Sequence, residues 1–354
     1  MQATVKVIAI ALDGGTWDVL DWFIDAGYMP HLKRLKEQGT YTNLLSTCPP
    51  STVPAWPSIV TGKNPGAQGI YGFFTRQLEN YELRLTHATE RKGRVFWHYL
   101  GAEGIRVGIL NIPLTYPPCP VNGFLVSGMM SPTEKGISYP EDFEVELKRK
   151  FNYRVSFKTF QRTDVNFVRD LKKGVELRTK AALLMLDKGV DFLMLMFRAT
   201  DLLQHKFWRE LEEIFSNSKK GNAKKLKEEI IDFYSWVDEC VGELVRNGGD
   251  DSIVMIFSDH GFGPRNRIVN LNNWLVKKRY LVPSRSLVSR TKYRMFRLGL
   301  TPKLAFQMVD KVKLGRIKSQ AGFKNLTVRW QPKFFFSLNN IDWGRSLIYS
   351  LGAF

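Results

Sequence analysis

Carboxylate and imidazole side chains directly follow three apolar runs of this sequence. The runs are residues 6–12, 191–197 and 252–258, and the side chains that follow them are Asp13, Asp201, His205, Asp259 and His260. Carboxylate oxygen together with imidazole nitrogen suits zinc, manganese or iron, whereas calcium and magnesium prefer oxygen ligands alone. These residue types therefore indicate a transition-metal site.

The spacing within each pair allows a shared ion. Asp201 and His205 are four residues apart, which places both on one face of a helical turn. Asp259 and His260 are adjacent, and adjacent side chains reach one ion only where the backbone turns, which the glycines of "SDHGFG" permit. Taken alone, an Asp after a strand is commonly a helix cap and a lone His a core or surface residue, so the interpretation depends on the joint arrangement.

A candidate nucleophile lies in the proline-rich stretch "CPPSTVPAWPSIVTG", residues 48–62. Prolines on both sides of Ser51 and Thr52 restrict the backbone, so a hydroxyl there can be held rigidly near the start of a helix. Coordination lowers the pKa of a hydroxyl and makes it a competent nucleophile, and the same ions neutralise phosphoryl oxygens. The alternative is that Ser51 or Thr52 only caps the helix.

Strands alternate with helices along the chain, which is typical of an open, largely parallel sheet with helices on both faces. The expected strands are residues 6–12, 106–112, 123–128, 191–197 and 252–258. The expected helices are residues 29–39, 94–104, 142–151, 165–189 and 224–249. Ligands of such sheets bind beyond the carboxyl ends of the strands, so the three runs are predicted to deliver their polar residues to one edge. The loop-rich stretch 112–141 is expected at the surface.

Composition indicates a globular protein. The chain has 354 residues, of which 44% are hydrophobic, enough to bury a sizeable core. The N-terminal apolar run ends at Asp13 without a cleavage site, and no run is long and uncharged enough to span a bilayer, so a cytoplasmic location is expected. The three widely spaced cysteines form no C-x-x-C pattern, which argues against a disulfide framework or a thiolate zinc site.

The chain is strongly basic. A formal net charge of +18 favours encounters with phosphates, nucleic acid or an anionic membrane surface. In the segment 277–333, Asp310 is the only acidic residue. The simpler interpretation of this segment is a solvated, partly helical insertion, and the alternative is a patch that attracts a polyanion or acidic lipid headgroups through "SLVSRTKYRMFRLGL". No specific nucleic-acid recognition is predicted.

The sequence resembles the alkaline phosphatase superfamily, in its type I phosphodiesterase/nucleotide pyrophosphatase branch, and is most similar to the archaeal and bacterial phosphohydrolase/phosphomutase group. Four stretches carry the resemblance in the family's order: "IALDGGTWD", "STVPAWPSIVTGKNPGAQGIYGF", "DLLQH" and "SDHG". The resemblance implies an α/β fold, an alkaline-phosphatase-like α/β/α sandwich with a largely parallel central sheet and inserted cap segments.

The resemblance also implies a division of the chain. Residues 1–275 would form the catalytic core, with a loop or cap insertion at about 112–190. Residues 276–335 would form a basic insertion or cap, and residues 336–354 the start of a C-terminal core segment that is cut short.

Carried over residue by residue, the resemblance implies two divalent metal ions, with zinc as the first choice and manganese as the alternative. The first ion would be held by Asp13, Thr52, Asp259 and His260, and the second by Asp201 and His205. Thr52 would attack phosphorus in line, and the second ion would activate the leaving oxygen and then water. The implied function is a metal-dependent phosphoric ester hydrolase that acts on a phosphate-ester small molecule or a nucleotide-like substrate.

Departures from the family pattern leave alternatives open. The family's second ion takes a further His downstream of "SDHG", and no His follows His260 in this sequence. Nucleotide pyrophosphatases carry Asn where this chain has Ala55 and Gly72-Phe73. The alternatives are a phosphomutase of the same superfamily, and a catalytically incomplete binding protein or half of a split enzyme completed by a C-terminal chain.

Overall fold

The structure is a computed structural model, and it describes residues 7–76, 83–155, 164–216, 224–267, 269–300 and 336–350. The chain divides into two compact units, residues 1–264 and 265–354. The three-part division predicted from the resemblance stays a prediction. Residues 301–335, which hold much of the predicted basic insertion, lie outside the described residues.

The first unit contains a six-stranded sheet with the strand order β6-β5-β4-β7-β1-β8. The strands are β1 (Val7–Leu12), β4 (Val107–Ile112), β5 (Gly123–Ser127), β6 (Ser138–Tyr139), β7 (Phe192–Phe197) and β8 (Ile253–Phe257). All neighbours pair in parallel except β5 and β6. Because β1 lies between β7 and β8 and pairs in parallel with both, the carboxyl ends of these three strands meet at one edge of the sheet.

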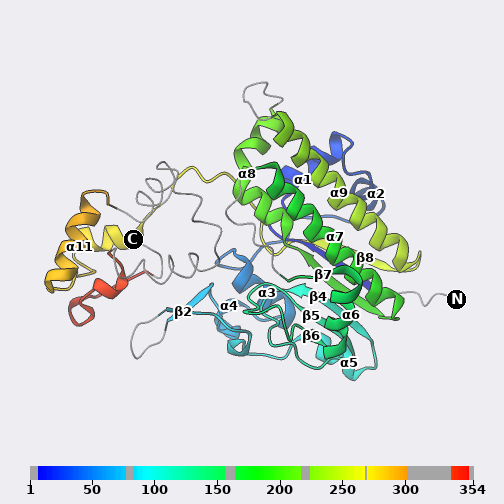
Figure 1. The fold of residues 1–354 in the computed structure, drawn as a ribbon, viewed down its shortest axis with the longest axis horizontal. Helices are drawn as coiled ribbons and strands as arrows, with labels where there is room; N and C mark the ends of the chain where they lie inside the picture. The colour runs from blue at the N-terminus through cyan, green and yellow to red at the C-terminus, as the bar shows by residue number, and fades with distance from the viewer. Residues whose placement is uncertain are drawn as a thin grey trace. The chain divides into compact units, whose positions relative to one another are not determined.

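Helices cover both faces of this sheet (Figure 1). The helices on one face are α1 (Trp17–Asp25), α2 (Pro30–Gln38), α6 (Glu141–Phe151), α7 (Val165–Asp187), α8 (Ala199–Phe215) and α9 (Lys224–Gly248). The other face carries α3 (Thr52–Thr61) and α5 (Phe96–Ala102), and the short α4 (Pro65–Gln68) follows α3. Strand β1 divides its side chains between the two cores: Ile8 and Ile10 join the first, and Ala9 and Ala11 the second. Burial on both faces explains why the strand reads as a continuous apolar run.

The predicted elements agree closely with the structure. Each of the five expected strands is present with its ends within one residue, and the five expected helices correspond to α2, α5, α6, α7 and α9 within two residues. The fold class, α/β with a mostly parallel central sheet, is therefore confirmed. The surface expectation for residues 112–141 is wrong in part, because residues 112–115 and 125–128 are buried. The strand expected at 123–128 is β5, and β6 was not expected.

Smaller elements complete the described residues. The strands β2 (Phe74–Arg76) and β3 (Leu83–Leu85) form a separate antiparallel pair in the first unit, followed by the 3₁₀ turn η1 (Ala88–Glu90). The second unit contains α10 (Leu271–Lys277), α11 (Leu287–Arg297), η3 (Leu338–Asn340) and η4 (Trp343–Arg345) around a small apolar cluster.

Two expectations from composition can be compared with this fold. All three cysteines are free thiols. Among the helices that the structure describes, none has both the length and the apolar character needed to cross a bilayer.

Candidate metal centre and nucleophile

Strand β1 delivers Asp13 to the carboxyl edge of the sheet, where this residue is completely buried. The backbone N–H of Asp13 donates to the carbonyl oxygen of Phe197 (3.2 Å), which extends the β1–β7 pairing by one residue. The chain then turns at Gly14, whose φ is +66°. The N–H of Gly14 donates to Oδ1 of Asp259 (3.4 Å), so the turn after β1 is tied to the residue that follows β8.

Two side chains of helix α8 donate hydrogen bonds to the same turn. Thr200 Oγ1 donates to the carbonyl oxygen of Asp13 (2.6 Å), and Gln204 Nε2 donates to the carbonyl oxygen of Gly14 (3.0 Å). Both side chains are buried. Thr200 and Gln204 were not predicted from the sequence, where their only signal is a polar pair four residues apart, next to Asp201 and His205.

The turn after β8 is fixed by serine hydroxyls. Ser258 Oγ accepts from the N–H of Gly15 (2.8 Å) and donates to the carbonyl oxygen of His260 (2.7 Å). Ser46 Oγ donates to the carbonyl oxygen of Asp259 (2.6 Å). The backbone turns here, so the adjacent side chains of Asp259 and His260 can reach one ion, as the sequence predicted.

Thr52 is the first residue of α3, and its side chain is buried. Its Oγ1 lies 3.0 Å from Nε2 of His260 and 3.4 Å from Oδ1 of Asp13. Ser51, at the N-cap position, makes no capping hydrogen bond with its side chain. The Thr52 hydroxyl thus faces the carboxylates and the imidazole, at a helix N-terminus whose partial positive charge favours an anion.

The hydrogen bonds of His260 define its tautomer. Nδ1 lies 2.8 Å from the carbonyl oxygen of Gly261, which can only accept, so Nδ1 carries a proton. In the neutral ring, Nε2 then presents a lone pair toward Thr52, and it lies 3.5 Å from Oδ1 of Asp13 and 3.7 Å from Oδ2 of Asp259. A lone pair at this place accepts a hydroxyl proton or binds a cation.

Three predicted ligands form one compact group. Ligand atoms of Asp13, Asp201 and His260 all lie within 4.8 Å of one another, and this is the one such group of three or more acidic, His or Cys side chains among the described residues. His205 Nε2 lies 3.3 Å from Oδ1 of Asp201, and the His205 side chain is 60% exposed. Asp201 therefore connects the buried group to His205.

Electrostatics at this edge favours a bound cation. Oδ2 of Asp13 and Oδ2 of Asp259 are buried and have no hydrogen-bond partner among the described residues. Burial raises the pKa of Asp13 well above its usual value, the carboxylates of Asp259 and Asp201 add to that rise, and the guanidinium of Arg198 opposes it. Burial also raises the pKa of Asp259. A divalent cation offsets such repulsion, and mixed oxygen and nitrogen donors suit zinc or manganese, so these residues fit the predicted metal.

Aromatic contacts position the exposed imidazole. The ring of Phe262 lies edge-on to that of His205, with centroids 4.7 Å apart, and stacks on Trp208 at 5.4 Å. Phe262 was not predicted from the sequence, where its only signal is an aromatic residue between the glycines of "HGFG".

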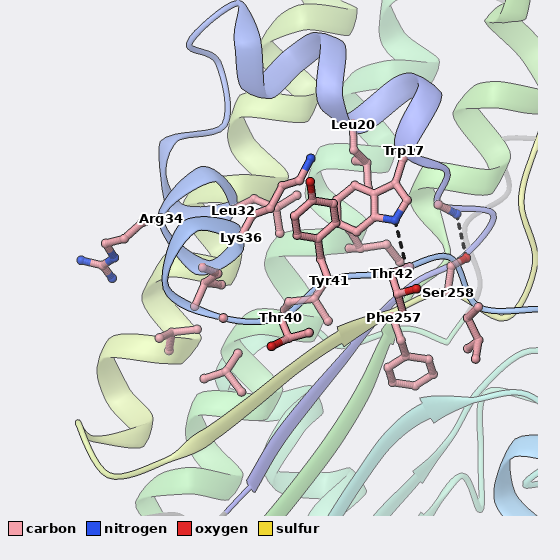
Figure 2. Close-up of a pocket in the computed structure, with 18 of the residues that line it drawn as sticks. Trp17, Leu20, Leu32, Arg34, Lys36, Thr40, Tyr41, Thr42, Phe257 and Ser258 are labelled. Carbon is pink, nitrogen blue, oxygen red and sulfur yellow. Dashed lines mark hydrogen bonds between the residues drawn. The ribbon is translucent and has the colours of Figure 1, made fainter.

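A pocket of about 960 Å³ lies beside the site, against β8 (Figure 2). Trp17 and Tyr41 line it, and Trp17 Nε1 donates to the carbonyl oxygen of Thr42 (3.3 Å). The lining includes Ser258 and His260. The pocket therefore borders the candidate metal centre, and Thr52 is not among its lining residues.

The fold and the site together define a class. A mostly parallel α/β sheet that carries carboxylates and imidazoles at its carboxyl edge is the arrangement that the resemblance to the alkaline phosphatase superfamily implied. A family model, "Type I phosphodiesterase / nucleotide pyrophosphatase", matches residues 7–325, and the chain belongs to this family of phosphoester hydrolases.

Solved structures agree with this fold. Phosphonoacetate hydrolase from Sinorhizobium meliloti 1021, in complex with phosphonoformate, is 22% identical with a TM-score of 0.53. Its complex with phosphonoacetate is 19% identical with a TM-score of 0.51. Each match covers 78% of this chain and 62% of the hydrolase chain, so this chain spans less than two thirds of the hydrolase's length. A comparison with curated proteins found no match.

Proposed function

We propose that the protein is a metal-dependent phosphoric ester hydrolase in which Thr52 is the nucleophile at a site for two divalent ions, zinc or manganese. The main support is the convergence of Thr52 Oγ1, His260 Nε2 and Asp13 Oδ1 within 3.5 Å of one another. These atoms come from three distant parts of the chain and meet where two carboxylate oxygens have no hydrogen-bond partner among the described residues.

The predicted ligands divide between two ions. The first ion would take Asp13, Thr52, Asp259 and His260, and the second would take Asp201 and His205. When bound, the ions lower the pKa of a hydroxyl and neutralise the oxygens of a phosphoryl group. Ligand atoms of Asp201, Asp13 and His260 lie within 4.8 Å of one another, so the residues that would hold the second ion adjoin those that would hold the first.

The chain's own residues orient the attack. The N-terminus of α3 and the 3.0 Å contact with Nε2 of His260 fix the place of the Thr52 hydroxyl, and a bound first ion would take the Nε2 lone pair in place of the hydroxyl proton. Burial of Thr52 and Asp13 limits access of water before substrate binds. The bond from Thr52 Oγ1 to phosphorus forms as the bond from phosphorus to the leaving oxygen breaks, and the leaving alcohol takes up a proton. Water then cleaves the threonine ester, which restores the hydroxyl and releases the phosphate product.

The proposed substrate is a phosphate ester of a small molecule, including nucleotide-like esters. Because the solved neighbours are a phosphonoacetate hydrolase, phosphonoacetate belongs in the same assay. An aryl phosphate monoester and a diester test the two ester classes directly.

The decisive experiment measures bound metal and turnover on the same preparation. Metal-free protein should turn over none of the three substrates, and added zinc or manganese should restore turnover of at least one ester. Failure of every substrate after metal loading would refute the hydrolase. Phosphoryl migration within a substrate, without release of phosphate, would instead identify the phosphomutase.

A catalytically incomplete binding protein is the second candidate. Only Asp201 and His205 are assigned to the second ion, whereas a catalytic zinc site ordinarily has three protein ligands. The same preparation distinguishes this candidate, because it would bind a cation and turn over no substrate. If the chain is instead half of a split enzyme, a second chain that supplies the missing histidine should restore turnover.

A further inference from the structure

Helix α11, in the second unit, has two apolar faces, and one of them is uncovered. Tyr293 and Phe296 pack against the small apolar cluster of this unit, and Ser289 is buried on the same side. On the opposite side Leu287 and Leu298 are each 81% exposed. The outward face of a helix in a globular unit is ordinarily polar, so a second apolar face indicates an additional contact.

The exposed apolar side chains form a continuous stripe. At 3.6 residues per turn they occupy an arc of about 100° on the surface of α11. The members of the stripe are Leu287, Val288, Met295 and Leu298, with the small side chain of Thr291 between them. We call these residues the apolar stripe.

Basic residues border the apolar stripe. Arg290, Arg294 and Arg297 are exposed and lie along one border, and Lys292 lies along the other. No acidic residue occurs in α11. Long basic side chains keep their charged ends at the level of lipid headgroups while the apolar residues between them enter the acyl region.

We propose that α11 docks on an anionic lipid surface, with the apolar stripe inserted among the lipids and the three arginines paired with lipid phosphates. Charge complementarity selects anionic lipid, because the segment 277–333 carries a single acidic residue, Asp310. A nucleic acid would pair its phosphates with the arginines but leave the leucines exposed to water. It would therefore explain the basic border but not the apolar stripe. The proposal is independent of the hydrolase activity and concerns the second unit alone.

Sedimentation of the full chain with vesicles tests this docking. Vesicles of equimolar phosphatidylglycerol and phosphatidylcholine should bind the protein, and vesicles of phosphatidylcholine alone should not. The triple variant Arg290→Gln, Arg294→Gln, Arg297→Gln should bind about a hundredfold more weakly, at roughly fivefold per charge. The matched control is Arg149→Gln, Lys173→Gln, Lys225→Gln, which removes three exposed charges from the first unit and should change binding little.

The apolar stripe is tested separately. The double variant Leu287→Ser, Leu298→Ser should weaken binding about tenfold or more, including at high salt, because salt screens charges and not apolar insertion. Leu45→Ser, at a leucine that is 95% exposed in the first unit, is the control. Thermal unfolding of each variant without vesicles checks that the fold is intact.

A fluorophore gives a second reading of insertion. In a Cys48→Ser background, an environment-sensitive dye on Leu298→Cys should shift to the blue with anionic vesicles, and the same dye on Leu45→Cys should not. Absence of vesicle binding would overturn the proposal. Loss of binding in the arginine variant alone, with no dye shift and equal affinity for single-stranded RNA, would overturn it in favour of a polyanion.

Discussion

Oγ1 of Thr52 lies 3.0 Å from Nε2 of His260, although the two residues are 208 positions apart in the chain. The first begins α3 on one face of the sheet, and the second follows β8 at the sheet's edge. Because each atom is held by its own turn, the distance between them depends on the packing of the whole first unit. A site of this kind is absent from the unfolded chain, so cation binding and folding are expected to be coupled.

Replacement of Thr52 tests the nucleophile. We expect Thr52→Ala to lower kcat on an aryl phosphate ester at least about a thousandfold, because no other hydroxyl takes its place, while Thr52→Ser keeps much of the activity. Ser51→Ala is the matched control, since Ser51 is adjacent and makes no capping hydrogen bond. Mass spectrometry of rapidly quenched reactions should show a phosphorylated peptide in wild type but not in Thr52→Ala. Equal turnover by Thr52→Ala and wild type would assign the attack to another group.

Cation binding should stabilise the fold through the buried carboxylates. At a free cation concentration about a hundred times Kd, linkage predicts a gain in unfolding free energy of about 2.7 kcal/mol, visible as a higher midpoint of thermal unfolding. Asp13→Asn should reduce this gain, and in chelator it should be at least as stable as wild type, because it removes a buried charge. Asp18→Asn, an exposed acid on α1, is the control and should respond as wild type does. An undiminished gain in Asp13→Asn would exclude Asp13 as a ligand.

Comparison of Gly14→Ala with Gly27→Ala separates steric crowding of Asp201 from the strain of a positive φ. A Cβ on Gly14 would lie 3.3 Å from both Cβ and Oδ1 of Asp201, whereas a Cβ on Gly27 would meet nothing within 4 Å. Both glycines have positive φ, so Gly14→Ala and Gly27→Ala should each lose about 1 kcal/mol of unfolding free energy. Only Gly14→Ala should also weaken cation binding and lower kcat, because only its methyl group displaces Asp201. Equal activity in the two variants would show that the close approach is unimportant.

The strands that deliver the site were predictable because their physical signal is local. Strand β1 and strand β7 are buried on both faces, so each reads as an uninterrupted apolar run that a polar residue ends. The positions of Asp13 and Asp259 at one edge then follow from parallel pairing alone.

Other parts of the first unit depend on tertiary contacts and left no such signal. Strand β6 has two residues, too few for a periodic pattern. The approach of Asp201 to Asp13 depends on the bare backbone of Gly14, which spacing along the chain does not reveal.

Asp238 should be important for stability because it satisfies the N-terminus of α2. Its Oδ2 accepts from the N–H of His31 (2.8 Å) and its Oδ1 from the N–H of Leu32 (2.7 Å), and its side chain is fully buried. We expect Asp238→Ala to lower the unfolding free energy by about 2 kcal/mol or more, since two buried donors lose their acceptor. Glu239→Ala removes only a part-exposed ion pair with His31 and should cost less than about 1 kcal/mol. Urea denaturation of both variants checks the difference.

The same carboxyl group predicts a pH dependence. Burial raises the pKa of Asp238 above its usual value of 3.8, although the N–H groups of His31 and Leu32 oppose the rise. A raised pKa means that the folded state binds this proton more tightly, so the stabilisation is complete below 3.8 and is lost as pH rises through the folded pKa. The unfolding free energy of wild type minus that of Asp238→Asn should therefore fall as pH rises from about 4 and then level off. A difference that increases with pH would show that the carboxylate is the preferred form in the folded protein.

Phe262 is expected to act on the proposed second ion by positioning His205. Its ring lies edge-on to the imidazole and stacks on Trp208, so Phe262→Ala should leave the exposed His205 free to rotate away from Asp201. We expect a weaker affinity for the second cation, by about tenfold, and a lower kcat at limiting metal that excess metal restores. Phe262→Tyr keeps the ring and serves as the matched variant, with wild-type metal dependence expected. Metal titrations followed by calorimetry and by turnover measure both effects. A loss of kcat that excess metal does not restore would place Phe262 in contact with the substrate instead.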